Sequence, residues 1–474
     1  MKYFKEKQGM IVLSIVPDDK AELLSLKAQY SGYYFEYRLD LADNWLWLDG
    51  DTVDEQVILT LRDSAEAGGI EQAHILDINE KLELLWDWQK EYGCMIDIEL
   101  RNLDAIKEFG KLDKDKLLVS WHSFGEYSKQ ELAANINAIE NFSSSYGKIA
   151  LNVENWEQFA EICEMVKSSQ MEFLAAFMGK SGVSQRCLYR FAGAIGTYAG
   201  FKGSETADGQ PDIELVEDIG LKGLTGKENI SGIIGSEQVL RSLGISYYNK
   251  KFQEHGVDAI YLPFVIEELS DFVRWVKKTK VNKIVSGFSV TMPFKEELTK
   301  LVNKKNRVVN FWNGKEFMMN TDMSAMREIL EQLGINSKSI VLVAGSGGSA
   351  RTALNALAKY KCQIEISARN FPEAIALAKD FGSKYVIPEN TNKKDYDLLI
   401  NATALGMKGE NLLDMIKSRK FKAAIDLPYN NADTPLAKYC HKKERKYVSG
   451  RDFWQLQARE QEEIFMNSNK VTEV

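Results

Sequence analysis

Short apolar runs alternate with longer amphipathic stretches along roughly the first 215 residues. The apolar runs are rich in β-branched and aromatic residues, which is typical of strands; they read MIVLSIV, YYFEYRLD, VILTLR, CMIDIEL, LLVSWHSF, KIALNV and EFLAAFM. The stretches between them, such as KQELAANINAIENF, repeat apolar residues at helical spacing. Strands that alternate with helices predict parallel βα units. With an eighth strand near FAGAIGTYAGF, the pattern predicts a closed (β/α)8 barrel.

A second α/β series begins near residue 231, and it contains a glycine-rich turn. In SIVLVAGSGGSARTALNALAKY, an apolar run is followed by Gly345, Gly347 and Gly348 and then by an alanine-rich helix. Glycines let the backbone approach a pyrophosphate, and the helix amino terminus offers it free N–H groups. The next apolar run ends at Arg369, where an NAD enzyme usually has an acidic residue. An arginine here can bind the 2′-phosphate of NADP, so it favours NADP as the cofactor. The alternative is that Arg369 is an ordinary surface residue after a strand.

Composition and charge exclude several classes of protein. With 45% hydrophobic and 27% charged residues among 474, the chain is typical of globular proteins with more than one domain. A net charge of -8 gives no basic surface for nucleic acid, and no apolar run is long enough for a membrane span. The five cysteines are isolated, which favours reduced thiols over a disulfide or zinc framework. We therefore expect a cytoplasmic enzyme with no metal, nucleic-acid or membrane partner.

Charged residues end several of the apolar runs in the first half, and the carboxyl ends of barrel strands are where such folds place their chemistry. Lys148 lies in an apolar run, where its amine is suited to form a Schiff base with a carbonyl, and His122 is suited to transfer protons. Arginines can bind a carboxylate with two hydrogen bonds, and the candidates at strand ends are Arg38, Arg62 and Arg186, with Glu36 two residues before Arg38. The alternatives are a lysine that snorkels from a strand end, a core histidine and a solvated Glu36–Arg38 ion pair.

The segments EYRLD, LRDSAEAGG, SWHSF, KIALNV, MGKSGVSQR and TADGQP, in this order, resemble the type I 3-dehydroquinate dehydratases. The resemblance implies that Lys148 forms a Schiff base with the ring ketone and that His122 moves protons while water is eliminated. It further implies that Glu66 orients His122. The substrate would be held by Glu36, Arg38, Arg62, Arg186, Thr206 and Gln210.

In the second half, Lys295 and Asp322 follow strand-like runs and could form a proton-transfer pair or be surface residues. The segments GFSVTMPFK, MMNTD, GSGGSAR, NATALGM, IDLPYNNADTPL and SGRDFWQLQA resemble shikimate dehydrogenases. The resemblance implies that this pair assists hydride transfer between NADPH and 3-dehydroshikimate. It implies substrate contacts from Ser242, Thr291, Asn310 and Gln457, and cofactor contacts from Ala344, Gly345, Ser346, Gly347, Gly348, Ser349, Ala350, Arg369, Thr403, Met407 and Gly450.

One motif of the second family is altered in this chain. The family has two serines spaced by one residue and followed by proline, whereas the chain reads GSEQVLRSLGISYYN over residues 235–249. Aligned on Asn249, the first serine is Ser242, but glycine and isoleucine stand for the second serine and the proline, at Gly244 and Ile245. Aligned on Gly235, both serines are lost. We consider Arg241 and Ser246 as replacements for the contact with the substrate carboxylate.

Together the two resemblances imply a bifunctional enzyme of the shikimate pathway, because the first reaction makes the substrate of the second. The expected architecture is α/β: a (β/α)8 TIM barrel over residues 1–220, a substrate domain over 230–325 completed by 453–474, and an NADP-binding Rossmann domain over 326–452. We expect 3-dehydroquinate, 3-dehydroshikimate and shikimate as ligands, and a monomer or dimer. The alternatives are a quinate dehydrogenase or a non-catalytic NADP-binding module in the second half, and another Schiff-base lyase or aldolase in the first.

Overall fold

The computed structural model describes residues 9–63, 76–142, 144–303, 308–428 and 433–467. The chain divides into two compact units, Met1–Phe294 and Lys295–Val474. Each unit is a layered α/β structure of its own. The division into three domains with the boundaries given above stays a prediction.

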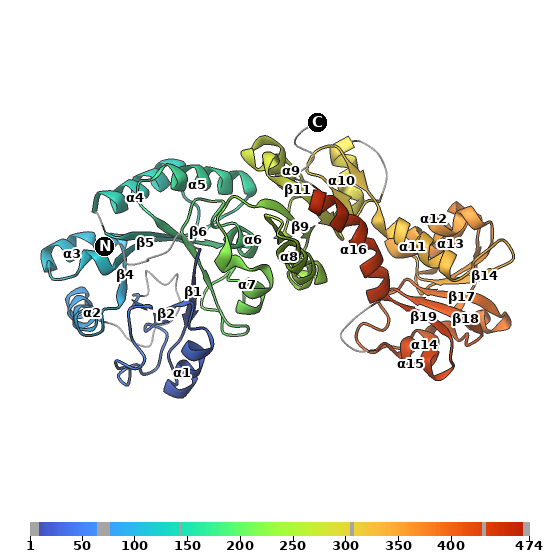
Figure 1. The fold of residues 1–474 in the computed structure, drawn as a ribbon, viewed down its shortest axis with the longest axis horizontal. Coiled ribbons are helices and arrows are strands. Elements are labelled where there is room, and N and C mark those ends of the chain that lie inside the picture. Colours follow the sequence, from blue (N-terminus) through green and yellow to red (C-terminus); the bar gives the residue numbers. More distant parts are fainter. Residues whose placement is uncertain (1–8, 64–75, 143, 304–307, 429–432, 468–474) are drawn as a thin grey trace. The chain divides into compact units, whose positions relative to one another are not determined.

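The first unit begins with a closed barrel of eight parallel strands (Figure 1). Its strands are β1 Met10–Ile15, β2 Tyr34–Arg38, β3 Val57–Thr60, β4 Met95–Glu99, β5 Leu117–Ser123, β6 Tyr146–Asn152, β7 Phe173–Met178 and β8 Gly196–Ala199. The barrel closes where β1 pairs with both β2 and β8. This confirms the predicted (β/α)8 barrel, including the eighth strand.

Six α-helices of the described residues connect the barrel strands: α1 Lys20–Gln29, α2 Ile78–Tyr92, α3 Leu103–Phe109, α4 Lys129–Phe142, α5 Trp156–Ser168 and α6 Gly182–Cys187. A seventh, α7 Ile213–Ile219, follows β8. Local sequence fixes their ends and faces. Helix α2 starts with a capping box between Asp77 and Glu80 and ends at Gly93, whose φ of 70° is the left-handed conformation that favours glycine. Helix α5 buries Trp156, Phe159, Ile162 and Val166, so that one apolar face packs inward.

Every second side chain of a barrel strand faces inward, and along several strands these inward-facing residues change from apolar to polar. In β4 the series is Met95, Asp97 and Glu99, and in β6 Lys148 follows Tyr146 on the same face. The apolar residues form a buried layer at the amino ends of the strands. The barrel interior is therefore apolar at the amino ends of its strands and charged at their carboxyl ends.

After the barrel, the first unit continues with three parallel strands in the order β10-β9-β11. These are β9 Asn229–Gly235, β10 Ala259–Val265 and β11 Val285–Val290, with helices α8 Leu243–His255 and α9 Leu269–Lys278 between them. This region is the start of the predicted substrate domain.

The second unit contains a six-stranded parallel sheet of order β16-β15-β14-β17-β18-β19. Counted from β14, this is the order 3-2-1-4-5-6 of dinucleotide-binding folds, which confirms the predicted Rossmann domain. The strands are β14 Ile340–Ala344, β15 Gln363–Ser367, β16 Lys384–Tyr385, β17 Tyr396–Asn401, β18 Phe421–Asp426 and β19 Lys446–Ser449. Its other elements are α10 Phe294–Asn303, β12 Phe311–Trp312, β13 Met318–Met319, α11 Thr321–Gln332, α12 Gly348–Leu357, α13 Phe371–Asp380, α14 Leu412–Ile416, α15 Pro435–Lys442 and α16 Gly450–Asn467.

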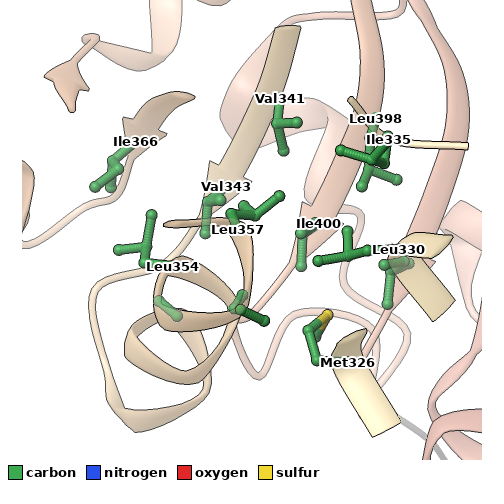
Figure 2. Packing of buried hydrophobic residues seen from close by; sticks show 14 of the residues in the cluster. Met326, Leu330, Ile335, Val341, Val343, Leu354, Leu357, Ile366, Leu398 and Ile400 are labelled. Carbon is green, nitrogen blue, oxygen red and sulfur yellow. The ribbon is translucent and has the colours of Figure 1, made fainter. Parts of the chain in front are cut away.

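Figure 2 shows the core on one face of this sheet, where apolar side chains of β14, β15 and β17 pack against α11 and α12. The labelled side chains are Met326, Leu330, Ile335, Val341, Val343, Leu354, Leu357, Ile366, Leu398 and Ile400. This packing fixes β14 and α12, and with them the glycine-rich turn between the two. Within the described ranges, no helix is both long and apolar enough to cross a bilayer.

Candidate active sites

A cavity of about 250 Å³ opens among the carboxyl ends of the barrel strands. It contains all eight residues that the sequence predicted for the first site and that the structure describes. The full lining is Ser14, Glu36, Arg38, Arg62, His122, Phe124, Lys148, Ala150, Ala176, Met178, Arg186, Tyr198, Thr206, Ala207, Asp208 and Gln210. Residues that are far apart in the sequence thus meet in one concave, charged space.

Lys148 projects into this cavity from β6 and is 4% exposed, so it does not snorkel to the surface. Its Nζ donates hydrogen bonds to Glu36 Oε1 at 2.8 Å and to Asp97 Oδ2 at 2.9 Å. The same atom lies 4.1 Å from the centre of the Tyr198 ring. Burial acts to raise the pKa of Glu36, but the charges of Lys148 and Arg38 outweigh it and lower that pKa to about 2. Among the described residues, Lys148 is the one lysine that lines the cavity.

His122 is oriented by a carboxylate at one of its ring nitrogens. Nδ1 is 2.7 Å from Glu99 Oε2 and 3.3 Å from Arg62 Nη1. Because the contact with Glu99 is the shorter one and a carboxylate only accepts, we assign the proton to Nδ1, which leaves Nε2 as a proton acceptor. Burial and the Arg62 charge lower the pKa of His122 to about 4, although Glu99 acts in the opposite direction. The free site therefore holds a neutral imidazole at neutral pH.

Asp97 and Glu99 are site residues that the sequence analysis did not identify. Arg62 bridges them, since Nη1 donates to Glu99 at 3.0 Å and Nη2 donates to Asp97 at 2.5 Å. Burial acts to raise the pKa of Asp97, but Arg62 and Lys148 hold it well below its ordinary value. The signal was in the segment CMIDIEL, where two acids spaced by one residue end an apolar strand. Glu66, which was expected to orient His122, lies outside the described residues, and Glu99 holds the Nδ1 side of the ring.

Glu36 and Arg38 are only 3% and 7% exposed, which excludes the alternative of a solvated ion pair between them, and Arg186 is fully buried. Arg38 donates from Nε and Nη2 to the Asp40 carboxylate at 3.0 and 2.7 Å. The Arg186 guanidinium donates to the carbonyls of Phe177 at 2.7 Å, Tyr198 at 3.4 Å and Asp208 at 2.8 Å. Burial lowers the pKa of Arg186 to about 10. It therefore stays cationic beside the cavity, where its guanidinium donates to these three backbone carbonyls.

Thr206 and Gln210 come from the loop after β8 and close one side of the cavity. The Thr206 hydroxyl donates to Ser14 Oγ at 2.7 Å, and Ser14 in turn donates to Glu36 Oε2 at 2.6 Å. Gln210 accepts from the Thr206 N–H at 3.0 Å and donates to the Ala199 carbonyl at 2.9 Å. Ser14, which sequence reasoning missed, thus connects the loop to Glu36.

The second unit brings Lys295 and Asp322 together. Lys295 lies in the first turn of α10 and Asp322 in the first turn of α11, and Nζ donates to Oδ2 at 2.6 Å. Their side chains are 26% and 18% exposed. The pair is therefore partly shielded but remains accessible to a ligand.

A buried set of amide and hydroxyl side chains lies next to this pair in the sequence and in the fold. Asn310 donates to Thr321 Oγ1 at 2.8 Å and to Gln457 Oε1 at 3.2 Å, and Thr321 donates to Gln457 at 2.9 Å. Gln461, one turn after Gln457 on α16, donates to Thr321 Oγ1 at 3.1 Å. The structure thus brings together the predicted Asn310 and Gln457, and it adds Thr321 and Gln461, which the sequence analysis did not identify.

The glycine-rich turn follows β14 and leads into α12. Gly345 has a φ of 122°, and a Cβ there would lie 2.6 Å from the carbonyl oxygen of Ala402. A Cβ on Gly347 or Gly348 would meet no heavy atom within 4 Å, so the space over the turn is open. An open turn at a helix amino terminus fits a pyrophosphate. Of the other predicted contacts, Ser346, Ser349 and Ala350 belong to the same turn and helix.

The remaining predicted cofactor contacts lie at the carboxyl ends of strands of this sheet. Arg369 follows β15 and is exposed, whereas Glu365 in the middle of β15 is buried and bonded to Lys394 and Tyr396. Glu365, the acidic residue of β15, is therefore not available to bind the ribose of a cofactor. Thr403, after β17, donates to Asn401 Oδ1 at 2.7 Å. Ala344 ends β14, Met407 is exposed, and Gly450 starts α16.

The altered serine motif lies at the start of α8 in the first unit. Ser242 caps this helix, because its hydroxyl accepts from the Gly244 N–H at 3.2 Å. A side chain at Gly244 would come within 3.2 Å of the Tyr261 ring and hydroxyl, so it would fit only if Tyr261 shifted by a few tenths of an ångström. Ser246 bonds to Asp218 of α7, so of the two considered replacements for the carboxylate contact we favour Arg241. The substrate roles of Ser242 and Thr291 stay predictions.

The chain matches two family models. Residues 27–219 match the type I 3-dehydroquinase model, and residues 233–310 match the shikimate dehydrogenase substrate binding domain. An NADP(+) shikimate dehydrogenase of Sulfolobus acidocaldarius is 30% identical over 50% of this chain and 89% of its own length. A chloroplastic bifunctional 3-dehydroquinate dehydratase/shikimate dehydrogenase of Arabidopsis thaliana is 24% identical over 86% of this chain and 72% of its own. The shikimate biosynthesis protein AroDE of Chlamydia pneumoniae is 27% identical over 79% of each.

A lysine-bearing barrel followed by a dinucleotide-binding fold defines a chain that combines a lyase-type site with an oxidoreductase-type site. The chain belongs to the shikimate dehydrogenase family through its second half, and it carries a type I 3-dehydroquinase domain in its first. The Sulfolobus acidocaldarius relative is an NADP(+) enzyme.

Proposed function

We propose that the chain catalyses two consecutive steps of the shikimate pathway: the barrel dehydrates 3-dehydroquinate to 3-dehydroshikimate, and the second half reduces 3-dehydroshikimate to shikimate with NADPH. The observation that carries the first activity is the buried, cavity-lining Lys148 with a neutral, oriented histidine beside it. The second rests on the Lys295–Asp322 pair in a chain that belongs to the dehydrogenase family.

In the first reaction, the Lys148 amine attacks the ring ketone and loses water to form an imine. The imine draws electrons from the neighbouring carbon and acidifies its proton, which Nε2 of His122 accepts. The electron pair left on carbon expels the β-hydroxyl group, and the protonated His122 returns the proton so that water leaves. Hydrolysis of the imine frees the product and restores the Lys148 amine.

The charged groups around Lys148 have complementary tasks in this scheme. Glu36 and Asp97 accept hydrogen bonds from the amine in the free site, so they hold Nζ in place until substrate arrives. Arg186, which donates to backbone carbonyls, is suited to bind the substrate carboxylate. Glu99 keeps the proton on Nδ1 of His122 and so keeps Nε2 ready to accept another.

In the second reaction, NADPH supplies a hydride to the carbonyl carbon when it is bound. Lys295, held by Asp322, is the group that donates a proton to the carbonyl oxygen as negative charge develops there. Asn310 and Gln457 lie close to this pair and offer amide groups for the ring hydroxyls. Arg369 is suited to bind the 2′-phosphate, since it stands at the end of β15 without an acidic neighbour on that strand end.

Borohydride trapping tests the first activity. Sodium borohydride added to the protein with 3-dehydroquinate should reduce the imine and fix a ligand adduct on Lys148, which peptide mass spectrometry locates. Lys148→Met should give no adduct and lose dehydratase turnover, while it still reduces 3-dehydroshikimate. An adduct on another lysine, or none with the wild-type protein, would refute the Schiff-base assignment.

A second candidate for the dehydrogenase half is a related polyol substrate such as quinate, and the observation that favours it is Gly244 in place of the second serine. Initial rates with shikimate and quinate, each with NADP and NAD, separate the two. We expect the highest kcat/KM with shikimate and NADP, and a higher kcat/KM with quinate would reassign this half.

A further inference from the structure

Helix α6 is bonded on its outer side to β10, a strand that follows the barrel within the first unit. The Ser181 hydroxyl donates to the carbonyl oxygen of Val265 at 2.9 Å, and the Val265 N–H donates to Ser184 Oγ at 2.8 Å. The two serines are three residues apart and therefore lie on one face of the helix. Both backbone polar groups of the last residue of β10 are thus bonded to α6.

The position of α6 depends on such contacts because the helix is too short to be stable alone. It has six residues, and isolated helices of this length are marginal in water. Ser184, Gln185 and Arg186 are all fully buried. On the inner side, a Cβ on Gly182 would lie 2.8 Å from the Phe177 carbonyl oxygen, so α6 packs closely on the end of β7. The barrel and β10 therefore hold α6 between them.

Arg186 links this contact to the dehydratase cavity. Its residue is two positions after Ser184, its guanidinium is fixed by three carbonyls, and it lines the cavity. A displacement of α6 would move the guanidinium relative to Lys148. Misplacing a binding group by about 1 Å costs up to roughly a hundredfold in rate, so a small shift is measurable.

The same interface has a second half that does not reach the cavity. The N–H of Trp156, at the start of α5, donates to Asp271 Oδ2 of α9 at 2.7 Å. The Trp156 ring packs against Phe264, Phe272 and Trp275, with ring centres 4.6 to 5.9 Å away. None of these side chains lines the cavity. Asp271 therefore provides a matched control for loss of one interface hydrogen bond.

We propose that Ser184 is a positioning residue of the dehydratase reaction, and that β10, a strand of the dehydrogenase half, is part of the scaffold that places Arg186. This inference rests on the proposed dehydratase function. It makes the first active site dependent on a strand that lies beyond the barrel in sequence.

Steady-state kinetics of full-length variants test the proposal. Ser184→Ala should raise KM for 3-dehydroquinate about tenfold and leave kcat within about twofold, because Lys148 and His122 are untouched. Borohydride trapping at saturating substrate should remain at the wild-type level. Asp271→Ala should lower the thermal midpoint of unfolding about as much as Ser184→Ala does. It should nevertheless leave KM and kcat unchanged.

An unchanged KM in Ser184→Ala would overturn the proposal, and so would an equal rise in Asp271→Ala, since that would reflect general loosening of the interface. Ser181→Ala is the second variant and should change KM in the same direction as Ser184→Ala. Wild-type protein that neither turns over nor traps 3-dehydroquinate would refute the proposed dehydratase instead, so the two failures are distinguishable.

Discussion

His122 is buried near Arg62 and Lys148, and these surroundings set the pH range in which it can act as a base. Burial and Arg62 bring its pKa down to about 4 despite the opposing charge of Glu99. The imidazole is neutral above its pKa, so it stays ready to accept a proton as the pH falls through the ordinary histidine range. We expect dehydratase kcat/KM, which reports on the free enzyme, to be flat from about pH 8 to pH 5.5 and to fall near pH 4.

An acid limb near the ordinary histidine pKa of about 6.5 would contradict this assignment. Circular dichroism at each pH distinguishes protonation of His122 from unfolding. Glu99→Gln is the control variant: it removes a charge that raises the pKa of His122, so any acid limb should move to lower pH. Its kcat should also fall, because the amide no longer fixes the proton on Nδ1.

Residue types at strand ends were a good guide to the first site but an incomplete one. Lys148, His122 and Arg62 are ionisable residues of the apolar runs, and they meet in the cavity. Asp97 and Glu99 follow the same rule but were not collected, and Ser14 gave no signal, because a serine in a strand has many uses. The buried bond of Arg38 to Asp40 also could not be foreseen, since burial depends on how the barrel closes.

The glycine-rich turn between β14 and α12 allows a prediction at the scale of an element. In Gly345→Ala, the new Cβ would meet the Ala402 carbonyl oxygen at 2.6 Å in a conformation that L-residues rarely adopt. We expect the free energy of unfolding of the second unit to fall by about 2 kcal/mol or more. Thermal unfolding of the full chain measures this, and dehydratase activity should persist at room temperature.

Gly348→Ala is the matched control, because its Cβ would meet no heavy atom within 4 Å and alanine favours a helix. Its stability should be unchanged or higher by up to about 1 kcal/mol. Equal destabilisation of both variants would show that the close approach of Gly345 to Ala402 is not what demands glycine in this turn.

The elements themselves were largely predictable because their periodicity is local. All eight barrel strands and the strand–turn–helix of the dinucleotide fold stand where the apolar runs predict them. The bonds of Ser181 and Ser184 to Val265 were not predictable, since they join residues about 80 positions apart whose types are common at any surface. Ser242 shows a related limit of sequence-based prediction. A serine can cap a helix or bind a ligand, and here it caps α8.

At the scale of the whole molecule, the two activities should be separable by point substitutions. Lys148→Met should abolish only the dehydratase, and Asp322→Asn should greatly lower only the dehydrogenase, since each side chain has its partners within its own unit. An equimolar mixture of the two variants should convert 3-dehydroquinate to shikimate with a lag, because the intermediate passes through solution. If the mixture showed no NADPH oxidation although each variant kept its other activity, independent action of the two sites would be refuted.

The most direct measurement adds 3-dehydroquinate and NADPH to the purified wild-type protein and follows cofactor absorbance and products over time. We predict loss of NADPH that requires 3-dehydroquinate, with shikimate formed in equal amount. If 3-dehydroshikimate accumulated while NADPH stayed constant, the dehydratase would stand and the reductive half of the account would be wrong. If 3-dehydroquinate were not consumed at all, the central claim of a bifunctional enzyme would fail.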